Sequence, residues 1–564
     1  MSWLAPLLEK NGEIAVFLAI GLGYWIGKFK FKGVGFGPVT GSLLAGVLIG
    51  NVAHVPVSDT AKQILFLMFM YGIGYSAGPG FIRGIRDGGW RWVAVGFAVP
   101  LTGLLTAFVM ARLLHLQLGY AAGMMSGGLT ESPIIGTASE AIRSLALSDE
   151  EKSRLVSQIP VADALTYIFG TFGVIFFCSY IGPWLLRLDL QAHALGLEKE
   201  MGFVRQKAGV ESALHMHELR AYRLEASMPV VGKTIRHVES SIAHERVFIE
   251  RVRREGRIID VAPDLVLRDG DVVLLIGRQE TLVNLVGERA DEVFDRELLD
   301  VPSATYDVVL TSKEVKGQTL NELRDDVGLR GLFLKAIHRN GQSIPIAPAT
   351  KLYRGDTLTL YGLEPAVQRA ALRAGTVLQL TSRSDYVACA LAIAVGALLG
   401  LVLAFPAGGL HIALGTSVAT LVVGLAMGWR NSVRPSFAML APDAIDLMTS
   451  IGLAGFVAMI GLKAGPIFVE AMKEIGLAVF LGGVVVTLVP QFVGLLVGRY
   501  VLRLDPLLLL GALAGAQTMT AGLAAVQERS GSPIAVIGYS STVAFGHILL
   551  SMFGTALIWL LHAA

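Results

Sequence analysis

Two stretches of the 564-residue sequence, Ile73-Gly-Tyr-Ser-Ala-Gly-Pro-Gly-Phe81 and Ile460-Gly-Leu-Lys-Ala-Gly-Pro-Ile-Phe468, repeat one another at an offset of 387 residues. The repeat extends to both sides of these stretches. Gly37, Gly46 and Gly50 return as Gly415, Gly424 and Gly428, and Gly123, Gly127, Thr130 and Glu140 return as Gly511, Gly515, Thr518 and Glu528. Because the motifs keep their order, the two ends of the chain are predicted to be copies of one structural unit.

Composition divides the chain into two apolar blocks around a soluble insert. Of all residues, 53% are hydrophobic and 16% charged, with a mean hydropathy of +0.60, whereas soluble domains carry about 25% charged residues. Residues 201–380 hold 50 of the 92 charged side chains. We therefore expect a membrane protein with one repeat at 1–190, soluble lobes at 205–290 and 300–375, and a second repeat at 382–564. The net charge of +2 does not indicate a nucleic-acid partner.

Ten apolar segments, five in each block, reach the roughly 20 residues that a helix needs to cross a bilayer. They lie at 13–29, 33–52, 60–79, 92–114 and 160–186 and at 384–405, 409–428, 443–464, 475–500 and 534–561. Two further segments, 118–139 and 506–526, are apolar at both ends but small and polar in the middle.

The positions of Lys and Arg decide whether these two further segments cross the membrane. With the soluble insert in the cytoplasm, five spans per block and two re-entrant hairpins place 11 basic loop residues inside and 8 outside, whereas six spans per block place 7 inside and 12 outside. Basic residues concentrate on the cytoplasmic side, so the first arrangement is predicted. An odd number of spans per block makes the repeats inverted, with both termini extracytoplasmic, which is typical of secondary transporters.

Polar residues in the middle of the two hairpin segments are the first candidates for a substrate site. Left unsatisfied in hydrocarbon, each would cost on the order of several kcal/mol. Half-helices that begin near the midplane direct N–H groups and a positive dipole end toward it, which suits a carboxylate. We expect the two tips to meet and bind an anionic substrate; the alternative is that these groups only satisfy one another. The candidates are Ser126, Gly127, Thr130, Glu131, Ser132, Gln517, Thr518 and Thr520.

Three ionisable residues in or near the spans complete the candidate site, because an intramembrane charge is a functional candidate by default. Asp163 is a candidate partner for a substrate ammonium or a coupled proton. His547 is a candidate because histidine is the side chain suited to a change of charge near physiological pH; the alternative is a packed, hydrogen-bonded histidine. Lys463 is a candidate partner for a carboxylate, with snorkelling to the outer surface as the alternative. Glu131 would repel a dianion unless it is protonated or paired.

The two Ala-Gly-Pro motifs are predicted to interrupt or end spans 3 and 8. Proline removes a backbone donor and glycine adds backbone freedom, so Gly78-Pro79 and Gly465-Pro466 are candidate helix breaks. The glycines around residue 78 have an alternative role, which is to let neighbouring helices approach closely.

The soluble insert is itself a tandem repeat at an offset of 85 residues. Gly232-Lys-Thr-Ile235 returns as Gly317-Gln-Thr-Leu320, and Gly270-Asp271 returns as Gly355-Asp356. Alternating runs read as strands, with the Gly-Asp pairs turning into the last strand of each copy. These copies resemble the C-terminal lobe of the domains that regulate potassium conductance (RCK domains). The charged segment Asp291–Asp300 is expected to be an exposed connector between them.

The order of elements resembles that of the aspartate:alanine exchanger family of bacterial antiporters, in which two such lobes divide an inverted membrane repeat that carries Gly-x-x-Ala-Gly-Pro. The resemblance covers essentially the whole chain. It implies exchange of small amino acids or C4-dicarboxylates, a homodimer, and a bacterial inner-membrane location with the lobes in the cytoplasm.

The predicted fold is thus a polytopic α-helical membrane protein with an inverted 5+5 repeat, two re-entrant hairpins and two α/β lobes. The predicted function is exchange of small carboxylates by alternating access; the alternative is an ion channel or cation transporter gated by the lobes. No enzymatic motif, cofactor or metal site is indicated, and His215 with His217 alone does not define one. Expected partners are the substrate, the lipid bilayer, a second copy of the chain and a small regulatory ligand on the lobes.

Overall fold

The computed structural model describes residues 4–563 in two compact units. Outside the described residues lie 29, 32–33, 36, 87–88, 204–216, 242–246, 260, 279–280, 283–290, 313, 325–330, 340–341, 379–383, 408–409, 414 and 435–436. The first unit comprises Met1–Glu198, His338–Pro345 and Leu380–Ala564, and the second comprises Lys199–Ile337 and Ile346–Gln379.

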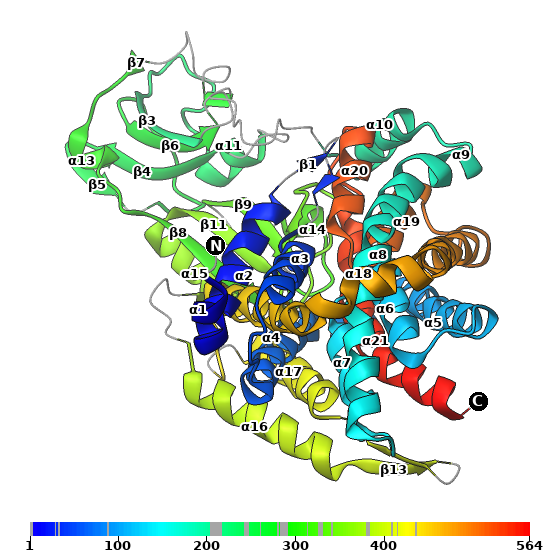
Figure 1. Ribbon diagram of the computed structural model, residues 1–564. Helices are drawn as coiled ribbons and strands as arrows, with labels where there is room; N and C mark the ends of the chain where they lie inside the picture. Colours follow the sequence, from blue (N-terminus) through cyan, green and yellow to red (C-terminus); the bar gives the residue numbers. More distant parts are fainter. Residues whose placement is uncertain are drawn as a thin grey trace. The chain divides into compact units, whose positions relative to one another are not determined.

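The first unit is helical, and helices of its two sequence halves interleave (Figure 1). The N-terminal half contains α1 (Leu4–Lys10), α2 (Gly12–Gly27), α3 (Gly37–Val52), α4 (Asp59–Arg86), α5 (Trp90–Leu113), α6 (Leu118–Gly128), α7 (Pro133–Ser144), α8 (Asp149–Phe176), the π-helical turn η1 (Phe177–Ile181), α9 (Gly182–Leu185) and α10 (Leu190–Met201). The C-terminal half contains α16 (Tyr386–Val402), α17 (Thr416–Val433), α18 (Pro442–Leu496), η5 (Val497–Val501), α19 (Pro506–Ala516), α20 (Thr520–Ser530) and α21 (Val536–Ala563).

Among the described residues, six helical segments are long and apolar enough to cross a membrane. They are Asp59–Ile85, Trp90–Leu113, Asp149–Leu185, Pro442–Gly465, Ile475–Val501 and Val536–Ala563. Shorter apolar helices are Gly12–Gly27, Gly37–Val52, Tyr386–Val402 and Pro506–Ala516. The ten expected spans overlap helices, but α3 and α17 begin later than expected because short strand pairs precede them. These pairs are β1 (Lys30–Phe31) with β2 (Val34–Gly35), and β13 (Ala404–Ala407) with β14 (Leu410–Ala413).

Local sequence explains where helices begin. The Ser148 hydroxyl accepts a hydrogen bond from the Glu151 amide, and three acidic residues follow in the first turn of α8. At α19, the Asp505 carboxylate accepts hydrogen bonds from the Leu507 and Leu508 amides. Both are N-caps that satisfy amides left without an intrahelical partner.

A glycine seam joins α4 to α17. A Cβ atom at Gly424 would lie 2.5 Å from the Tyr71 carbonyl oxygen, and one at Gly78 would lie 2.8 Å from the Trp429 amide nitrogen. The prediction of a helix break at Gly78-Pro79 is wrong, because α4 continues through Pro79 to Arg86. The glycine instead permits close helix packing, the alternative role considered for it.

A second glycine seam, made of matching motifs, joins α3 to α18. A Cβ atom at Gly46 would lie 2.5 Å from the Ala458 carbonyl oxygen, and one at Gly465 would lie 2.6 Å from the Asn51 amide nitrogen. The expected break at Gly465-Pro466 is therefore also wrong: α18 runs through this motif, and Gly465 lets α3 approach. Along both seams, residues with higher numbers in one helix contact residues with higher numbers in the other. The two helices of each seam therefore run parallel.

By contrast, α4 and the first segment of α18 run antiparallel. A Cβ atom at Gly72 would lie 2.7 Å from Thr449 Cγ2, and one at Gly452 would lie 2.8 Å from the Leu65 carbonyl oxygen. Later residues of one helix thus contact earlier residues of the other.

Helix α6 lies along α8 and runs in the same direction. A Cβ atom at Gly119 would lie 2.8 Å from Gln158 Cβ, and one at Gly127 would lie 2.6 Å from the Tyr167 amide nitrogen. The N-terminal part of α8 therefore lies beside the start of α6, although α7 intervenes in the sequence.

The C-terminal half has the same arrangement, with α19 parallel to α21. A Cβ atom at Gly538 would lie 3.0 Å from the Ala512 amide nitrogen, and one at Gly546 would lie 3.0 Å from the Ala516 carbonyl carbon. Here α20 is the intervening helix.

Two antiparallel sheets of identical strand order characterise the insert. The first, β5-β4-β6-β3-β7, is formed by β3 (His217–Arg223), β4 (Phe248–Arg254), β5 (Arg257–Ile259), β6 (Val272–Arg278) and β7 (Asp291–Glu292). The second, β10-β9-β11-β8-β12, is formed by β8 (Ser303–Leu310), β9 (Leu332–Arg339), β10 (Gln342–Ile344), β11 (Thr357–Leu363) and β12 (Gly375–Leu378). Short helices α11 (Ile235–Ser241), α13 (Arg296–Leu299), α14 (Leu320–Arg324) and α15 (Glu364–Ala374) accompany the sheets.

Elements of the two sheets correspond at the offset of the sequence repeat. The isolated bridge Thr234–Val266 recurs 85 residues later as Thr319–Lys351. Gly270 and Gly355, which precede β6 and β11, have φ values of 80° and 86°, a region that favours glycine.

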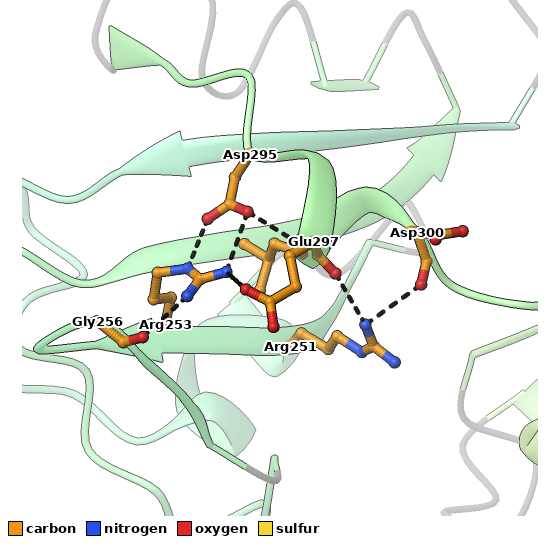
Figure 2. Close-up of polar contacts among 7 residues, drawn as sticks. Arg251, Arg253, Gly256, Asp295, Glu297 and Asp300 are labelled. Atoms are coloured by element: carbon orange, nitrogen blue, oxygen red, sulfur yellow. Dashed lines mark hydrogen bonds and ion pairs between the residues drawn. The ribbon is translucent and has the colours of Figure 1, made fainter.

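The sequence indicated that the segment Asp291–Asp300 is an exposed connector, but the segment is also part of the first lobe's structure. It forms the edge strand β7 and the helix α13, and Arg253 holds it by charged hydrogen bonds (Figure 2). Arg253 Nε and Nη2 donate to the two Asp295 carboxylate oxygens at 2.6 and 3.1 Å, and Nη2 also donates to Glu297 at 2.8 Å. The guanidinium thus ties this segment to β4.

The Arg253–Asp295 pair makes a pH-dependent contribution to the stability of the insert. The Arg253 hydrogen bond lowers the pKa of Asp295 in the folded protein, so the contribution is present at neutral pH and is lost as the pH falls through that lowered value. We expect Arg253→Met to destabilise residues 199–379 at pH 7 and to do so by less at pH 3, where Asp295 is partly protonated in the unfolded chain. Urea denaturation of this fragment, followed by circular dichroism, checks this; an equal loss at both pH values would contradict it.

Candidate functional site

The turn between α6 and α7 forms the first tip, Leu129–Ser132. The Thr130 amide donates to the Gly127 carbonyl at 3.1 Å, and the Glu131 amide donates to the Ser126 carbonyl at 2.9 Å. This hydrogen-bond pair is the Schellman motif, whose terminal residue adopts a left-handed conformation. Thr130 occupies that position with φ of 56°.

The turn between α19 and α20 forms the second tip, Gln517–Met519, with the same geometry. The Thr518 amide donates to the Gly515 carbonyl at 2.9 Å, and the Met519 amide donates to the Ala514 carbonyl at 2.8 Å. Thr518, which matches Thr130 in the repeat, also has φ of 56°. A β-branched residue in this region is an outlier that costs about 1–3 kcal/mol. Both tips therefore hold a strained threonine at the same position of the repeat.

The two tips are in direct contact. Thr518 Oγ1 donates to Glu131 Oε2 at 2.7 Å, and Thr130 Oγ1 lies 3.2 Å from the Gln517 carbonyl oxygen. Residues 387 positions apart in the sequence therefore meet at one place, which we call the crossing.

Glu131 is the central acidic group of the crossing and is 1% exposed. Besides Thr518, two residues of α21 contact its other carboxylate oxygen, Oε1: His547 Nδ1 and Ser551 Oγ, both at 3.3 Å. These three contacts give both carboxylate oxygens a polar partner, as a buried polar group requires.

A second carboxylate, Asp163 of α8, lies behind the first tip and is 2% exposed. Ser126 Oγ donates to Asp163 Oδ1 at 2.6 Å and lies 3.2 Å from the Glu131 carbonyl oxygen. Ser126 thus links Asp163 to the backbone of the tip. The site has an acidic character, with two carboxylates and one histidine.

A chain of hydrogen bonds between neutral groups, which begins on α18, supports both tips and was not predicted from the sequence. Gln491 Nε2 donates to Gln517 Oε1 at 2.8 Å, Gln517 Nε2 donates to the Thr487 carbonyl at 3.3 Å, and Thr487 Oγ1 donates to the Gly128 carbonyl at 2.7 Å. The signal available in the sequence was a lone glutamine in the apolar segment 475–500, and the structure shows that this glutamine is fully buried.

The remaining predicted residues differ in their surroundings. Ser132 is buried, Thr518 half-buried and Thr520 exposed at the start of α20. Gly127 contacts α8: a Cβ atom there would overlap the Thr166 hydroxyl and the Asp163 carbonyl oxygen. Its position therefore indicates a role in close helix packing.

Lys463 is not at the crossing, contrary to the expectation that it would complete the same site. Its ammonium group donates to Asp59 Oδ1 at 3.1 Å, an oxygen that also contacts Lys62 at 2.7 Å and Arg143 at 3.3 Å. The side chain is exposed and turns toward the start of α4, in line with the snorkelling alternative.

Across the part of the chain that the structure describes, no three His, Cys, Asp or Glu residues gather in a way that could hold a metal ion. His215 lies outside the described residues, and His217 begins β3.

Comparison with known families gives two matches. Residues 15–183 and 388–559 match the family described as a predicted permease membrane region of the aspartate:alanine exchanger type, and residues 219–286 match the TrkA-C domain. The matched membrane regions are those that contain both tips, Asp163 and His547.

Curated relatives extend over nearly the whole chain. An uncharacterized transporter of Bradyrhizobium diazoefficiens is 44% identical over 92% of this chain and all of its own length. Uncharacterized transporters of Shewanella oneidensis and Bordetella bronchiseptica are 40% and 36% identical, over 100% and 98% of both chains respectively. No solved structure matches.

Proposed function

This chain belongs to the aspartate:alanine exchanger family of permeases and is a transporter, and we propose that it exchanges small carboxylate substrates across the membrane by alternating access. Candidate substrates are aspartate, alanine and C4-dicarboxylates. The observation that carries the proposal is the crossing, where two strained tips from matching sequence motifs enclose a buried carboxylate.

The directions of the helices support an inverted repeat. The first segment of α18 is parallel to α3 and antiparallel to α4, whereas α17 is parallel to α4. It follows that α3 and α17, which carry the matching glycines, run in opposite directions. A transporter built from two copies of one unit in opposite orientations has two equivalent conformations, one open to each face of the membrane.

Parallel packing of α6 with α8, and of α19 with α21, supports two re-entrant hairpins. If α6 and α7 crossed the membrane together, α8 would start on the far side and run antiparallel to α6. The observed contacts instead favour a path in which α7 returns the chain to the side from which α6 enters, and in which α20 does the same after α19. With inverted repeats, the two hairpins enter from opposite faces.

The chemistry of the crossing favours a substrate that carries both an ammonium and a carboxylate group. Glu131 and Asp163 are buried acceptors suited to an ammonium group or a coupled proton. The exposed start of α20 presents the Thr520 hydroxyl and backbone N–H groups to a carboxylate. An α-amino acid matches this arrangement, and a C4-dicarboxylate would need protonation of Glu131.

The exchange is electrogenic if a monoanion enters as a neutral amino acid leaves. Each elementary charge moved is worth about 2.3 kcal/mol per 100 mV, so such exchange would contribute to the membrane potential. We further propose a bacterial inner-membrane homodimer, with cytoplasmic lobes that bind a small regulatory ligand and extracytoplasmic termini. Its orientation rests on the distribution of Lys and Arg.

Uptake of labelled aspartate, alanine or succinate into proteoliposomes tests this function. We expect uptake of at least one of them to rise about tenfold or more when the vesicles contain unlabelled counter-substrate, because exchange requires a loaded return step. Uptake that is indifferent to internal substrate, or single-channel currents in its place, would contradict exchange.

A further inference from the structure

The second arms of the two hairpins match in sequence but have different surroundings. In α7, every residue from Pro133 to Ile142 is buried apart from Glu140, which is half-buried. In α20, only Gly522, Leu523, Val526 and Ser530 are buried. One face of the crossing is therefore closed by its hairpin, and the opposite face is open along α20.

On the closed face, Glu140 fastens α7 to the first turn of α17. Glu140 Oε1 accepts hydrogen bonds from the Thr416 amide and the Thr416 hydroxyl, both at 2.5 Å, and Oε2 accepts one from the Ser417 amide at 3.1 Å. The carboxylate thus caps a helix that has no capping side chain of its own. Arg143, one turn further along α7, adds the ion pair with Asp59.

On the open face, the matching groups are apart. Glu528, the counterpart of Glu140, is exposed and among the described residues makes no ion pair or side-chain hydrogen bond. Its neighbour Arg529 donates to the Ser179 carbonyl and stacks on Tyr180, with 3.9 Å from the guanidinium carbon to the ring centre. The arm α20 is therefore held against η1 at the end of α8.

The counterparts of the docking groups are nevertheless present on the open face. Helix α3 begins at Gly37 with φ of 75°, just as α17 begins after Gly415 with φ of 82°. Asp446, at the offset of 387 from Asp59, is exposed near the start of α18. These groups form a second docking place, to which the hairpin arm α20 is not bound in this structure.

We propose that Glu140 and Glu528 are the two gate residues of the transport cycle, which means that each fastens its hairpin and closes one face of the crossing. This proposal rests on the proposed exchange. In the opposite state, Glu140 leaves α17 while Glu528 caps α3 through the Val39 amide, and Arg529 moves from Ser179 to Asp446. The two halves then exchange conformations, and the crossing opens to the other face.

The second docking place offers fewer donors, which explains the state observed. Pro38 stands where α17 has Thr416 and therefore lacks both the amide and the hydroxyl donor. Glu140 accepts three hydrogen bonds from α17, whereas the Val39 amide offers Glu528 one. The state with Glu140 docked is thus favoured in the absence of substrate.

Distances between spin labels beside the start of α3 and on α20 test the gate without any substrate. Labels are placed on Lys28→Cys and Ala524→Cys, both exposed, after replacement of the buried Cys178 and Cys389 by alanine. Lys28 follows Gly27, which packs against Gly37 at the start of α3, and its substitution leaves Pro38 unchanged. In the parent protein we expect one long distance. Glu140→Gln removes a charged cap, so a shorter distance gains about tenfold in population.

Adding Glu528→Gln to Glu140→Gln is the matched control and is expected to reduce the short-distance population again. Should Glu140→Gln not fold, Arg143→Gln weakens the same docking and serves in its place. A distance distribution that neither Glu140→Gln nor Arg143→Gln alters would overturn the gate, even if carboxylate exchange is observed. A gate that moves in a protein without carboxylate uptake would instead refute the proposed substrates alone.

Discussion

Glu131→Gln lowers the rate of substrate exchange by about a hundredfold or more while the protein stays folded. The carboxylate of Glu131 is the group that both halves share, since Thr518 contacts one oxygen while His547 and Ser551 contact the other. Glutamine keeps the size and an acceptor oxygen but removes the charge. Loss of a buried charged partner is worth about 3 kcal/mol, which corresponds to about a hundredfold in rate.

The control for this prediction is Glu150→Gln, which removes an exposed carboxylate in the first turn of α8. Counter-substrate-dependent uptake into proteoliposomes gives the rate, and thermal unfolding in detergent reports on folding. We expect the control to retain full exchange. If the exchange rate of Glu131→Gln is within about twofold of the parent rate, this carboxylate does not contact the substrate.

Gly127→Val has the largest expected effect on stability, about 3 kcal/mol. A side chain there would overlap the Asp163 carbonyl oxygen and the Thr166 hydroxyl, and it would lie 2.6 Å from the Tyr167 amide nitrogen. Two of these three atoms belong to the α8 backbone, which cannot move aside as a flexible side chain would. Separation of α6 from α8 would also break the hydrogen bond between Ser126 and Asp163.

Gly21→Val is the matched control, because a Cβ atom at Gly21 meets nothing within 4 Å. The same helix penalty applies to both substitutions, so the difference in thermal unfolding temperature isolates the packing of α6 on α8. Equal stability of the two variants would contradict the close approach of these helices.

The sequence predicted the location of the crossing because the two tips interrupt apolar segments with polar residues. Thr130 and Thr518 share one position of the repeat, and the structure gives both the same left-handed conformation. Proximity of Asp163 and His547 to the tips also followed from the sequence, since an ionisable residue within a span needs a polar partner.

Other features depend on packing that periodicity does not encode. Gly78 and Gly465 looked like helix breaks, but the same residues serve close helix contact, and only the neighbouring helix distinguishes the two roles. Lys463 has a long side chain that reaches Asp59 rather than the crossing. Gln491 has no polar neighbour in the sequence, so its bond to Gln517 becomes visible only when α18 and α19 are packed.

The proposed exchange requires two hairpins that enter from opposite faces and share one substrate pocket at their tips. Single cysteines at Ala146 and Pro533, both exposed and each between a hairpin and the helix that follows it, test this arrangement in intact cells with an impermeant thiol reagent. We expect Ala146→Cys to react from outside, whereas Pro533→Cys reacts only after the membrane is opened. Reaction of both cysteines from the same side would exclude hairpins that enter from opposite faces.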